Sequence, residues 1–305
     1  MKRIIILIVC VLALGYANAQ EICLGTYNIR NENNYDVKNG NGWKQRCPVI
    51  CNMMKFENVD IFGSQEVLVG QLNDMLADLK DYSYIGVGRD DGREKGEYSP
   101  IIYKTSKFEL LKHGNFWLSE TPDVAGSKGW DAACIRICTW GHFQIKSSGR
   151  RFWYFNLHMD HKGVKARRES AKLVVKKIKE ITNGEPVILT GDFNVDQNNE
   201  IYTIFTKSGI LRDSYIIAKQ RFAENGTFNG FDPARKTDSR IDHIFVSDKI
   251  FVNHYGILTN CYWTPILENF KAEKGKDAPN EIDLYKYQSR TPSDHYPVLI
   301  KFSFN

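Results

Sequence analysis

The sequence predicts an α/β protein in which two mixed β-sheets pack face to face with helices outside them. Three observations predict this fold class. Short apolar segments, several with strict two-residue alternation, recur along the chain. Some of these segments are spaced like hairpins, whereas helical patterns separate others, so the sheets are expected to be mixed. No repeat, low-complexity tract or long linker divides the 305 residues, which favours a single domain.

Composition excludes several classes of protein. The chain is 42% hydrophobic and 12% aromatic, which excludes a disordered chain, a collagen and a small disulfide-stapled scaffold. The formal net charge is only +5. Proteins that bind nucleic acid by neutralising many phosphates carry a clustered basic excess, and the sequence shows none. Nucleic acid is therefore a less favoured partner, and no protein partner is inferred.

The first element is a predicted signal peptide over residues 1–19. Two basic residues precede an apolar run at 4–14, and Ala17 and Ala19 occupy the positions that a signal peptidase reads. The run is too short to span a bilayer. Cys10 lies inside the run, whereas a lipoprotein needs a cysteine after it. We therefore expect an exported protein whose mature part, residues 20–305, is a single domain without stable membrane insertion.

Strands and helices alternate along the mature chain. The predicted strands are residues 21–29, 60–66, 101–103, 134–145, 151–158, 187–190, 241–246 and 297–304. Three segments between them have apolar residues on one helical face and many Lys and Glu residues on the other. The three faces are Trp43, Cys47, Ile50, Cys51 and Met54; Leu72, Met75, Leu76 and Leu79; and Ala171, Val174, Val175, Ile178 and Ile181. Polar segments at 31–42, 86–97, 121–131 and 268–290 are predicted loops.

The spacing of the cysteines favours free thiols over disulfides. Cys134 and Cys138 lie in one predicted strand, where four residues separate Cα atoms by ~13 Å, beyond the ~7 Å limit for a disulfide. Cys47 and Cys51 lie one helical turn apart, so a bond between them is feasible but awkward. We favour buried thiols that pack as small hydrophobic side chains.

Polar residues with catalytic chemistry concentrate where the predicted strands end. Asp192 and Asn194 follow the apolar run at 187–189, at the carboxyl edge where open α/β sheets place ligands. Asp242 shares a strand face with apolar residues, so its carboxylate needs a partner. Six strand boundaries carry such strings: N-I-R at 28–30, Q-E at 65–66, N-L-H at 156–158, G-D-F-N at 191–194, R-I-D-H at 240–243 and S-D-H at 293–295.

In these six strings and their order, the chain resembles the endonuclease/exonuclease/phosphatase superfamily of metal-dependent phosphoesterases, which includes pancreatic-type deoxyribonuclease. The resemblance covers essentially the whole mature chain, and each string alone is weak. It implies a deoxyribonuclease-I-like four-layer α/β sandwich. Abasic-site endonucleases of this superfamily have an acidic residue where this chain has Arg30, so a DNA-repair function is disfavoured.

The resemblance also implies a metal site. Glu66 would be the principal Mg²⁺ ligand, helped by Asn28 and Asp294, with Mn²⁺ as a substitute. Carboxylate and amide oxygens are the ligands that this hard cation prefers. Each residue has a structural alternative: Asn28 could cap the following loop and Glu66 could form an ordinary ion pair.

The same resemblance implies the catalytic roles. Asp192 would orient or deprotonate the attacking water, with Asn194 holding it or a phosphate oxygen. His295 would contact the scissile phosphate, held by Asp242, which also gives that carboxylate its partner. His158 would be the phosphate-binding or leaving-group histidine. Taken alone, His158 would more often be a satisfied core histidine.

Loop residues are expected to recognise the substrate. Arginines could hold phosphate, Trp130 could stack on a sugar or base, and acidic side chains would accept hydrogen bonds from hydroxyls while repelling a long polyanion. The alternative is a surface salt-bridge cluster with a core-facing tryptophan. The candidates are Arg30, Arg89, Trp130, Asp131, Arg136, Asp160 and His161.

We therefore expect an exported Mg²⁺-dependent hydrolase of a small sugar-, inositol- or lipid-headgroup-like phosphate ester. Monoesters and diesters are both compatible with this set of residues. The alternatives are a secreted nuclease that degrades DNA or RNA and a catalytically silent binding protein.

Overall fold

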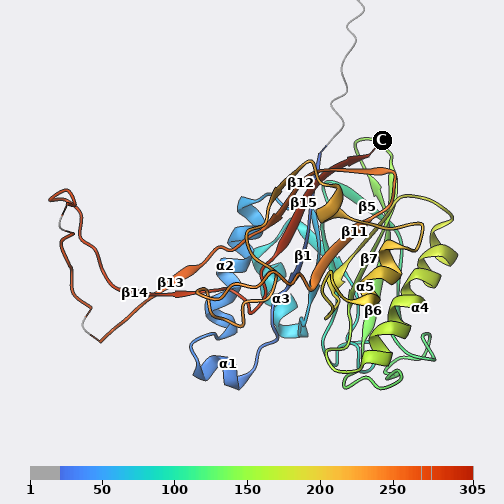
Figure 1. Cartoon of the computed structure of the whole chain (residues 1–305), viewed down its shortest axis with the longest axis horizontal. Helices are drawn as coiled ribbons and strands as arrows, with labels where there is room; N and C mark the ends of the chain where they lie inside the picture. The colour runs from blue at the N-terminus through green and yellow to red at the C-terminus, as the bar shows by residue number, and fades with distance from the viewer. Residues whose placement is uncertain (1–20, 269, 276, 305) are drawn as a thin grey trace, which may run out of the picture.

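Two β-sheets form the centre of the molecule in the computed structural model, which describes residues 21–268, 270–275 and 277–304 (Figure 1). The predicted signal peptide lies outside the described residues. Across the first sheet the strands are β10 (Gln220–Phe222), β12 (Ile250–Ile257), β15 (Val298–Phe304), β1 (Ile22–Asn28), β2 (Ile61–Gln65), β4 (Ile101–Lys104) and β3 (Tyr82–Ile85). Across the second they are β5 (Phe108–Trp117), β6 (Ile137–Ile145), β7 (Arg151–His158), β8 (Val187–Asp192), β11 (Asp242–Val246) and β9 (Arg212–Asp213). Both sheets mix parallel and antiparallel pairs, as predicted.

The apolar face of each long helix determines which sheet it covers. α2 (Trp43–Phe56) and α3 (Val69–Asp78) pack on the first sheet, and α4 (Val164–Thr182) and α5 (Glu200–Thr206) pack on the second (Figure 1). α4 buries the side predicted from its 3.6-residue period, including Val174 and Ile178, against Leu189 of β8. Two short helices, α1 (Asn34–Lys38) and α6 (Ser214–Ile217), complete the described helices.

Alternation along the strands separates the two sides of each sheet. In β1, Ile22 and Leu24 face the core between the sheets, whereas Cys23 and Tyr27 face α2 and α3. The second sheet contributes side chains such as Phe152 to the core between the sheets. The order helix, sheet, sheet, helix confirms the predicted four-layer sandwich.

The two sheets approach closely near the edge that carries the polar strings. A Cβ atom on Gly63 would collide with the side chains of Asn156 and Thr190, so glycine is needed in β2. Gln65 donates to Asn156 at 2.7 Å, and Asn156 donates to the carbonyl of Ser64 at 2.8 Å. This buried polar network joins the sheets and supports the residues above it.

Several elements were not predicted, and β-bulges explain the two longest. The register of β5 shifts between Leu110 and Lys112, and that of β12 shifts between Val252 and His254. A bulge adds a residue to one strand and so breaks the two-residue alternation. Smaller corrections concern β6, which begins at Ile137 rather than at 134, and the predicted loop 31–42, which contains α1.

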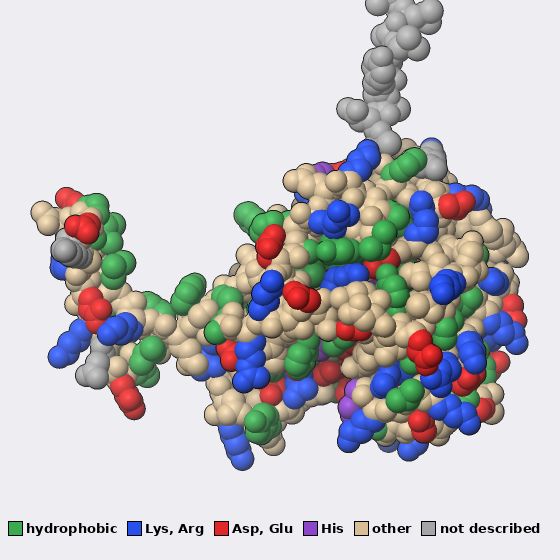
Figure 2. Space-filling model, in the orientation of Figure 1, with side chains coloured by type: hydrophobic (Ala, Val, Ile, Leu, Met, Phe, Trp, Pro, Cys, Tyr) green, Lys and Arg blue, Asp and Glu red, His purple; other side chains and the backbone are tan. Residues whose placement is uncertain are grey.

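A hairpin arm extends from the body at residues 262–268, 270–275 and 277–290 (Figure 1). β13 (Tyr262–Pro265) pairs with β14 (Tyr287–Arg290) at its base, so the predicted loop 268–290 ends in a strand. Arg290 anchors the base by donating to Asn41 Oδ1 at 2.9 Å. Hydrophobic side chains lie along the arm, and charges of both signs are interspersed over the visible face of the body (Figure 2). In the part of the chain that the structure describes, no helix combines the length and apolar character needed to cross a membrane.

The six cysteines among the described residues are thiols. The sulfur atoms of Cys47 and Cys51 lie 4.0 Å apart, about twice the length of a disulfide bond. Burial raises the pKa of the Cys138 thiol well above its usual range, so it stays protonated. This agrees with the predicted role of the cysteines as packing residues.

Candidate active site

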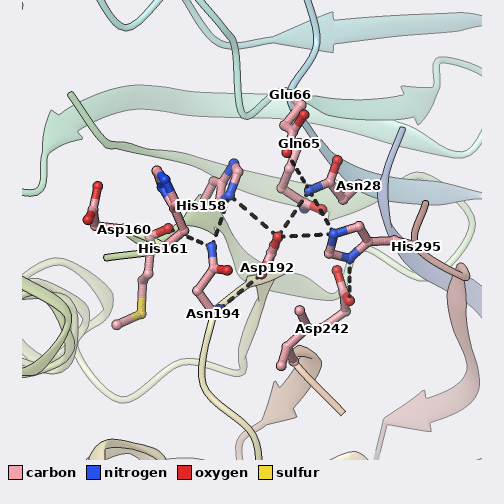
Figure 3. A network of polar contacts seen from close by, with 12 residues as sticks. Asn28, Gln65, Glu66, His158, Asp160, His161, Asp192, Asn194, Asp242 and His295 are labelled. Carbon is pink, nitrogen blue, oxygen red and sulfur yellow. Dashed lines mark hydrogen bonds and ion pairs between the residues drawn. The ribbon is translucent and has the colours of Figure 1, made fainter. Parts of the chain in front are cut away.

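The polar strand ends meet at one edge of the sandwich, between the two sheets (Figure 3). β1 and β2 are parallel neighbours, as are β7 and β8, so the carboxyl ends of each pair point the same way. A cavity of about 400 Å³ opens at this edge. It is lined by Arg30, Asn31, Glu66, Arg89, Glu97, Cys134, Arg136, His158, His161, Asp192, Asn194, Phe228, Asp294 and His295.

Antiparallel pairing brings two further segments to the same edge. β11 begins at Asp242, directly opposite Asp192 at the end of β8. β15 pairs antiparallel with β1, so Asp294 and His295, which precede β15, reach the end of β1. Strings more than 260 residues apart in the sequence therefore share one pocket.

Asp192 lies at the centre of the cluster and is 1% exposed. Its Oδ2 accepts from Asn28 Nδ2 at 3.0 Å, and its Oδ1 accepts from the backbone N–H of Asn194 at 2.9 Å. Burial, with the added repulsion of Asp242, raises the pKa of Asp192 to about 7, although His295 opposes the shift. A carboxylate with this pKa can accept a proton near neutral pH.

His295 and Asp242 form a buried pair beside Asp192. Nδ1 of His295 donates to Asp242 Oδ2 at 2.9 Å, and its Nε2 lies 3.7 Å from Asp192 Oδ2. Burial alone would lower the pKa of His295, but the carboxylates of Asp242 and Asp192 hold it well above its usual value. The imidazole is therefore a cation whose Nε2–H can reach the cavity, and Asp242 has the partner that the sequence required.

His158 also lies next to Asp192, but unlike His295 it is neutral. Its Nε2 lies 3.2 Å from Asn194 Nδ2 and 3.4 Å from Asp192 Oδ2. Burial, reinforced by Arg136 and Arg89, lowers the pKa of His158 well below its usual value. Its buried Nδ1 has no hydrogen-bond partner among the described residues. His158 lines the cavity as a neutral imidazole, so it can contact a ligand oxygen without adding charge.

Left-handed backbone conformations occur where the strands end. Arg30, Glu66 and Asn194 have φ angles of 59°, 60° and 51°, respectively. Such conformations cost roughly 1 kcal/mol or more for a residue with a side chain and persist where the surroundings hold them. Here they turn three side chains from the strands toward one cavity.

The acidic residues of the cavity fit a hard divalent cation. Glu66 and Asp294 both line it, and burial with the nearby charge of Glu66 raises the pKa of Asp294. Arg30 reaches Asp294 at 3.5 Å, but its Nε binds Asp36 at 2.9 Å. The carboxylate oxygens of Glu66 and Asp294 are the kind of ligand that Mg²⁺ prefers.

Asn28 donates hydrogen bonds to the carboxylates of Glu66 and Asp192. Its side chain is fully buried, with Nδ2 donating to Glu66 Oε1 at 3.1 Å and Oδ1 accepting from the backbone N–H of Arg30 at 3.0 Å. The amide thus presents its nitrogen, not its oxygen, to the acids. In this arrangement Asn28 positions Glu66, and its predicted role as a direct metal ligand stays a prediction.

Sequence reasoning missed Arg46, which positions two of the strand ends. Arg46 lies on the buried face of α2 and is fully buried. Its guanidinium donates to the backbone carbonyls of Ile29 at 2.5 Å, Arg30 at 3.1 Å and Pro292 at 3.0 Å. It therefore ties the end of β1 to the segment that carries Asp294. An arginine in a helix gave no signal because its partners are carbonyls distant in the sequence.

Four of the seven predicted substrate-binding residues line the cavity: Arg30, Arg89, Arg136 and His161. Arg136 is 5% exposed and donates to Nδ1 of His161 at 3.0 Å. Burial, with the nearby charge of Arg136, lowers the pKa of His161. Asn31, Glu97, Cys134 and Phe228 also line the cavity and were not predicted.

Trp130, Asp131 and Asp160, which were also predicted to contact substrate, are not among the residues that line the cavity. Asp131 accepts the backbone N–H of Ala166 at 2.6 Å, in the first turn of α4, where helix N–H groups lack partners. The backbone N–H of Trp130 donates to the carboxylate of Glu120. Asp160 is 1% exposed, and both of its oxygens accept backbone N–H groups.

Asp160→Asn is expected to lower the free energy of unfolding by about 2–4 kcal/mol at pH 7. The carboxylate accepts N–H groups of Ala133, Cys134, Lys162 and Gly163 at 2.7–3.1 Å and pairs with Arg136. Burial alone would raise the pKa of Asp160, but these donors hold it far below its usual 3.8. A depressed pKa adds stability above the unfolded value, so the contribution is lost as the pH falls below about 4. Urea unfolding at pH 7 and pH 3 measures both effects.

Asp123→Asn is the matched control, because the Asp123 side chain is 82% exposed. Equal stability of the wild type and Asp160→Asn at pH 7 would contradict the anchoring role of Asp160.

The chain is similar in sequence and fold to several known proteins. A family model described as the Endonuclease/Exonuclease/phosphatase family matches residues 25–295. An endonuclease/exonuclease/phosphatase family protein from Bacteroides thetaiotaomicron is 50% identical, with a TM-score of 0.87, over 94% of this chain and 99% of that one. A mannosyl-6-phosphatase from the same organism is 50% identical, with a TM-score of 0.85, over 93% and 100%. A Bacteroides vulgatus structure is 36% identical, with a TM-score of 0.79, over 94% and 100%.

Two uncharacterized proteins of Acanthamoeba polyphaga mimivirus are also similar. One is 34% identical over 164 residues, which are 50% of this chain and 60% of that protein. The other is 23% identical over 220 residues, which are 62% of this chain and 32% of that protein. The chain thus spans less than two thirds of either viral relative.

Proposed function

The chain belongs to the endonuclease/exonuclease/phosphatase family, and from that premise we propose that it is an exported, Mg²⁺-dependent phosphatase of small sugar phosphates. The observation that carries the proposal is the cluster of Asp192, His295 and His158 in one cavity with the carboxylates of Glu66 and Asp294. A volume of about 400 Å³ suits a small ligand. The similarity to a mannosyl-6-phosphatase supports a sugar phosphate monoester. Inositol and lipid-headgroup phosphates are the nearest alternatives.

The proposed reaction is direct attack of water on phosphorus, in which the ester P–O bond to the sugar breaks and the sugar leaves as an alcohol after taking up a proton from solvent. Asp192 accepts a proton from the water and orients it, because its pKa of about 7 balances ionisation against basicity. Cationic His295 donates from Nε2 to a phosphate oxygen, and neutral His158 contacts another. No side chain needs to form a covalent intermediate.

Glu66 and Asp294 would hold the cation next to the phosphate. Bound there, Mg²⁺ would neutralise the charge that develops on the phosphate oxygens. Arg30 and Asn28 keep the two carboxylates in place through the contacts described above. Export is supported by the predicted signal peptide at 1–19, and N-terminal sequencing of protein from an extracytoplasmic fraction tests it.

A phosphate-release screen tests the proposed function. Wild-type protein with Mg²⁺ is expected to release phosphate from sugar 6-phosphates faster than from inositol or lipid-headgroup phosphates. EDTA should abolish release, and Mg²⁺ or Mn²⁺ should restore it. Release that persists in EDTA would contradict the cation requirement. Faster cleavage of plasmid DNA or single-stranded RNA would favour a nuclease, and inactivity on every ester would favour a silent binding protein.

A further inference from the structure

We propose that Glu97 and Arg89 form a hydroxyl-binding pair that recognises two neighbouring hydroxyls of the sugar from which phosphate is removed. This inference rests on the proposed phosphatase function. Both side chains line the cavity, and the proposed reaction uses neither. They determine which leaving group is accepted.

The position of Glu97 places the pair beside the phosphate. Nδ2 of Asn31 donates to Glu66 Oε2 at 3.1 Å and to Glu97 Oε1 at 3.2 Å. A single amide nitrogen therefore separates a proposed cation ligand from Glu97. A phosphate held next to Glu66 brings the sugar attached to it within reach of Glu97.

The pair is held rigidly before substrate binds. Arg89 Nη1 donates to Glu97 Oε2 at 2.5 Å, and the backbone N–H of Arg89 donates to the carbonyl of Glu97 at 3.1 Å. Nε1 of Trp117 donates to the carbonyl of Arg89 at 2.6 Å. Preorganised groups lose little conformational entropy on binding, so their contacts contribute more to affinity.

The pair also has unused hydrogen-bonding capacity. Among the described residues, Nη1 of Arg89 donates to Glu97, whereas its buried Nε has no hydrogen-bond partner and lies 3.9 Å from Asp90 Oδ1. Glu97 accepts one side-chain hydrogen bond at each oxygen, which leaves further lone pairs. The side chains of Arg89 and Glu97 are 14% and 17% exposed, so a ligand can reach them.

The chemistry of the pair favours hydroxyls over an anion or a nucleobase. The paired charges cancel, so a second anionic group gains little, whereas each hydroxyl can donate to Glu97 and accept from Arg89. Nucleobases are bound by stacking on aromatic side chains. Histidines apart, Phe228 is the one aromatic side chain among the described lining residues, and it packs edge-on against His295. A polyhydroxylated leaving group is the chemical match.

Glu97→Gln tests the proposal, because it removes the charge and keeps the size of the side chain. We measure kcat/KM for a sugar 6-phosphate and for p-nitrophenyl phosphate, whose leaving group has no further hydroxyl. The ratio of the two constants is expected to fall about 10- to 100-fold, chiefly through KM for the sugar phosphate. Arg89→Gln should lower the same ratio. Glu94→Gln on the same loop is the matched control, since Glu94 is exposed and does not line the cavity.

A deoxy-sugar phosphate that lacks one recognised hydroxyl sharpens the test. The loss caused by Glu97→Gln should shrink on that substrate, because the protein change and the substrate change remove one interaction. Thermal unfolding identifies a variant that has lost its fold. An equal fall for both esters in both folded variants would overturn the proposal and place Glu97 in support of Glu66. Failure of the wild type on every ester would overturn the proposed function as well.

Discussion

Asp192→Asn is expected to lower kcat by about 1,000-fold with little change in KM, because general-base catalysis contributes roughly 10²- to 10⁴-fold. The amide keeps the shape of the carboxylate, but it has one acceptor oxygen, so it can keep only one of the two hydrogen bonds that Asp192 accepts from Asn28 and Asn194. It cannot accept a proton from water. Steady-state phosphate release with the preferred ester measures the change. Asp238→Asn is the control, since the Asp238 side chain is 93% exposed.

The same substitution carries two signatures that a structural role would not produce. In the wild type, kcat/KM should rise with pH up to about 7, as burial and Asp242 set the pKa of Asp192 there, and Asp192→Asn should remove this rise. A carboxyl whose folded pKa is raised destabilises the fold above its unfolded pKa. In cation-free buffer at pH 8 the variant should therefore melt at a higher temperature. Activity within threefold of the wild type would contradict the role of Asp192.

Asp242→Asn is expected to lower kcat by about 100- to 1,000-fold, although Asp242 does not line the cavity. Asp242 is fully buried, and its Oδ2 holds His295 Nδ1 at 2.9 Å. Burial alone would lower the pKa of His295, so losing the Asp242 charge should lower it. The active form is the protonated one. The alkaline loss of kcat/KM should therefore move to lower pH in the variant.

Coupling to His295 distinguishes this positioning role from a general loss of stability. His295→Ala should be nearly as impaired as the double variant Asp242→Asn/His295→Ala, because both changes disable one imidazole. Additive losses, or an unchanged alkaline limb in Asp242→Asn, would contradict the assignment. Thermal unfolding of each variant controls for misfolding.

Local patterns in the sequence were sufficient to predict the polar residues that the structure brings together. Asp192 and Asn194 follow an apolar strand directly, and Asp242 is an acid on an apolar face, so each can be recognised within its own segment. The six strings occur in the order typical of the endonuclease/exonuclease/phosphatase family, to which the chain belongs. The prediction was less successful where local pattern and local geometry diverge, as in β5 and β12, whose bulges interrupt the alternation.

Substrate-facing residues were harder to predict because acidic loop residues have competing local roles. Asp131 and Asp160 are acidic side chains of the kind that can bind hydroxyls, yet their carboxylate oxygens accept hydrogen bonds from backbone N–H groups. Glu97 is also an acidic loop residue, but it lines the cavity, as Asn31 does. The difference lies in loop conformation, which the spacing of residues does not encode.

The sequence by itself determined the layered α/β architecture and the chemistry of the strand ends, because period-two and period-3.6 patterns and strand boundaries are local properties. Only the tertiary structure decided which loop side chains face the cavity and that the amide nitrogen of Asn28 faces the acids. It also decided the charge states of His295 and His158. These depend on burial and on partners distant in the sequence, such as Asp242 for His295 and Arg136 for His158.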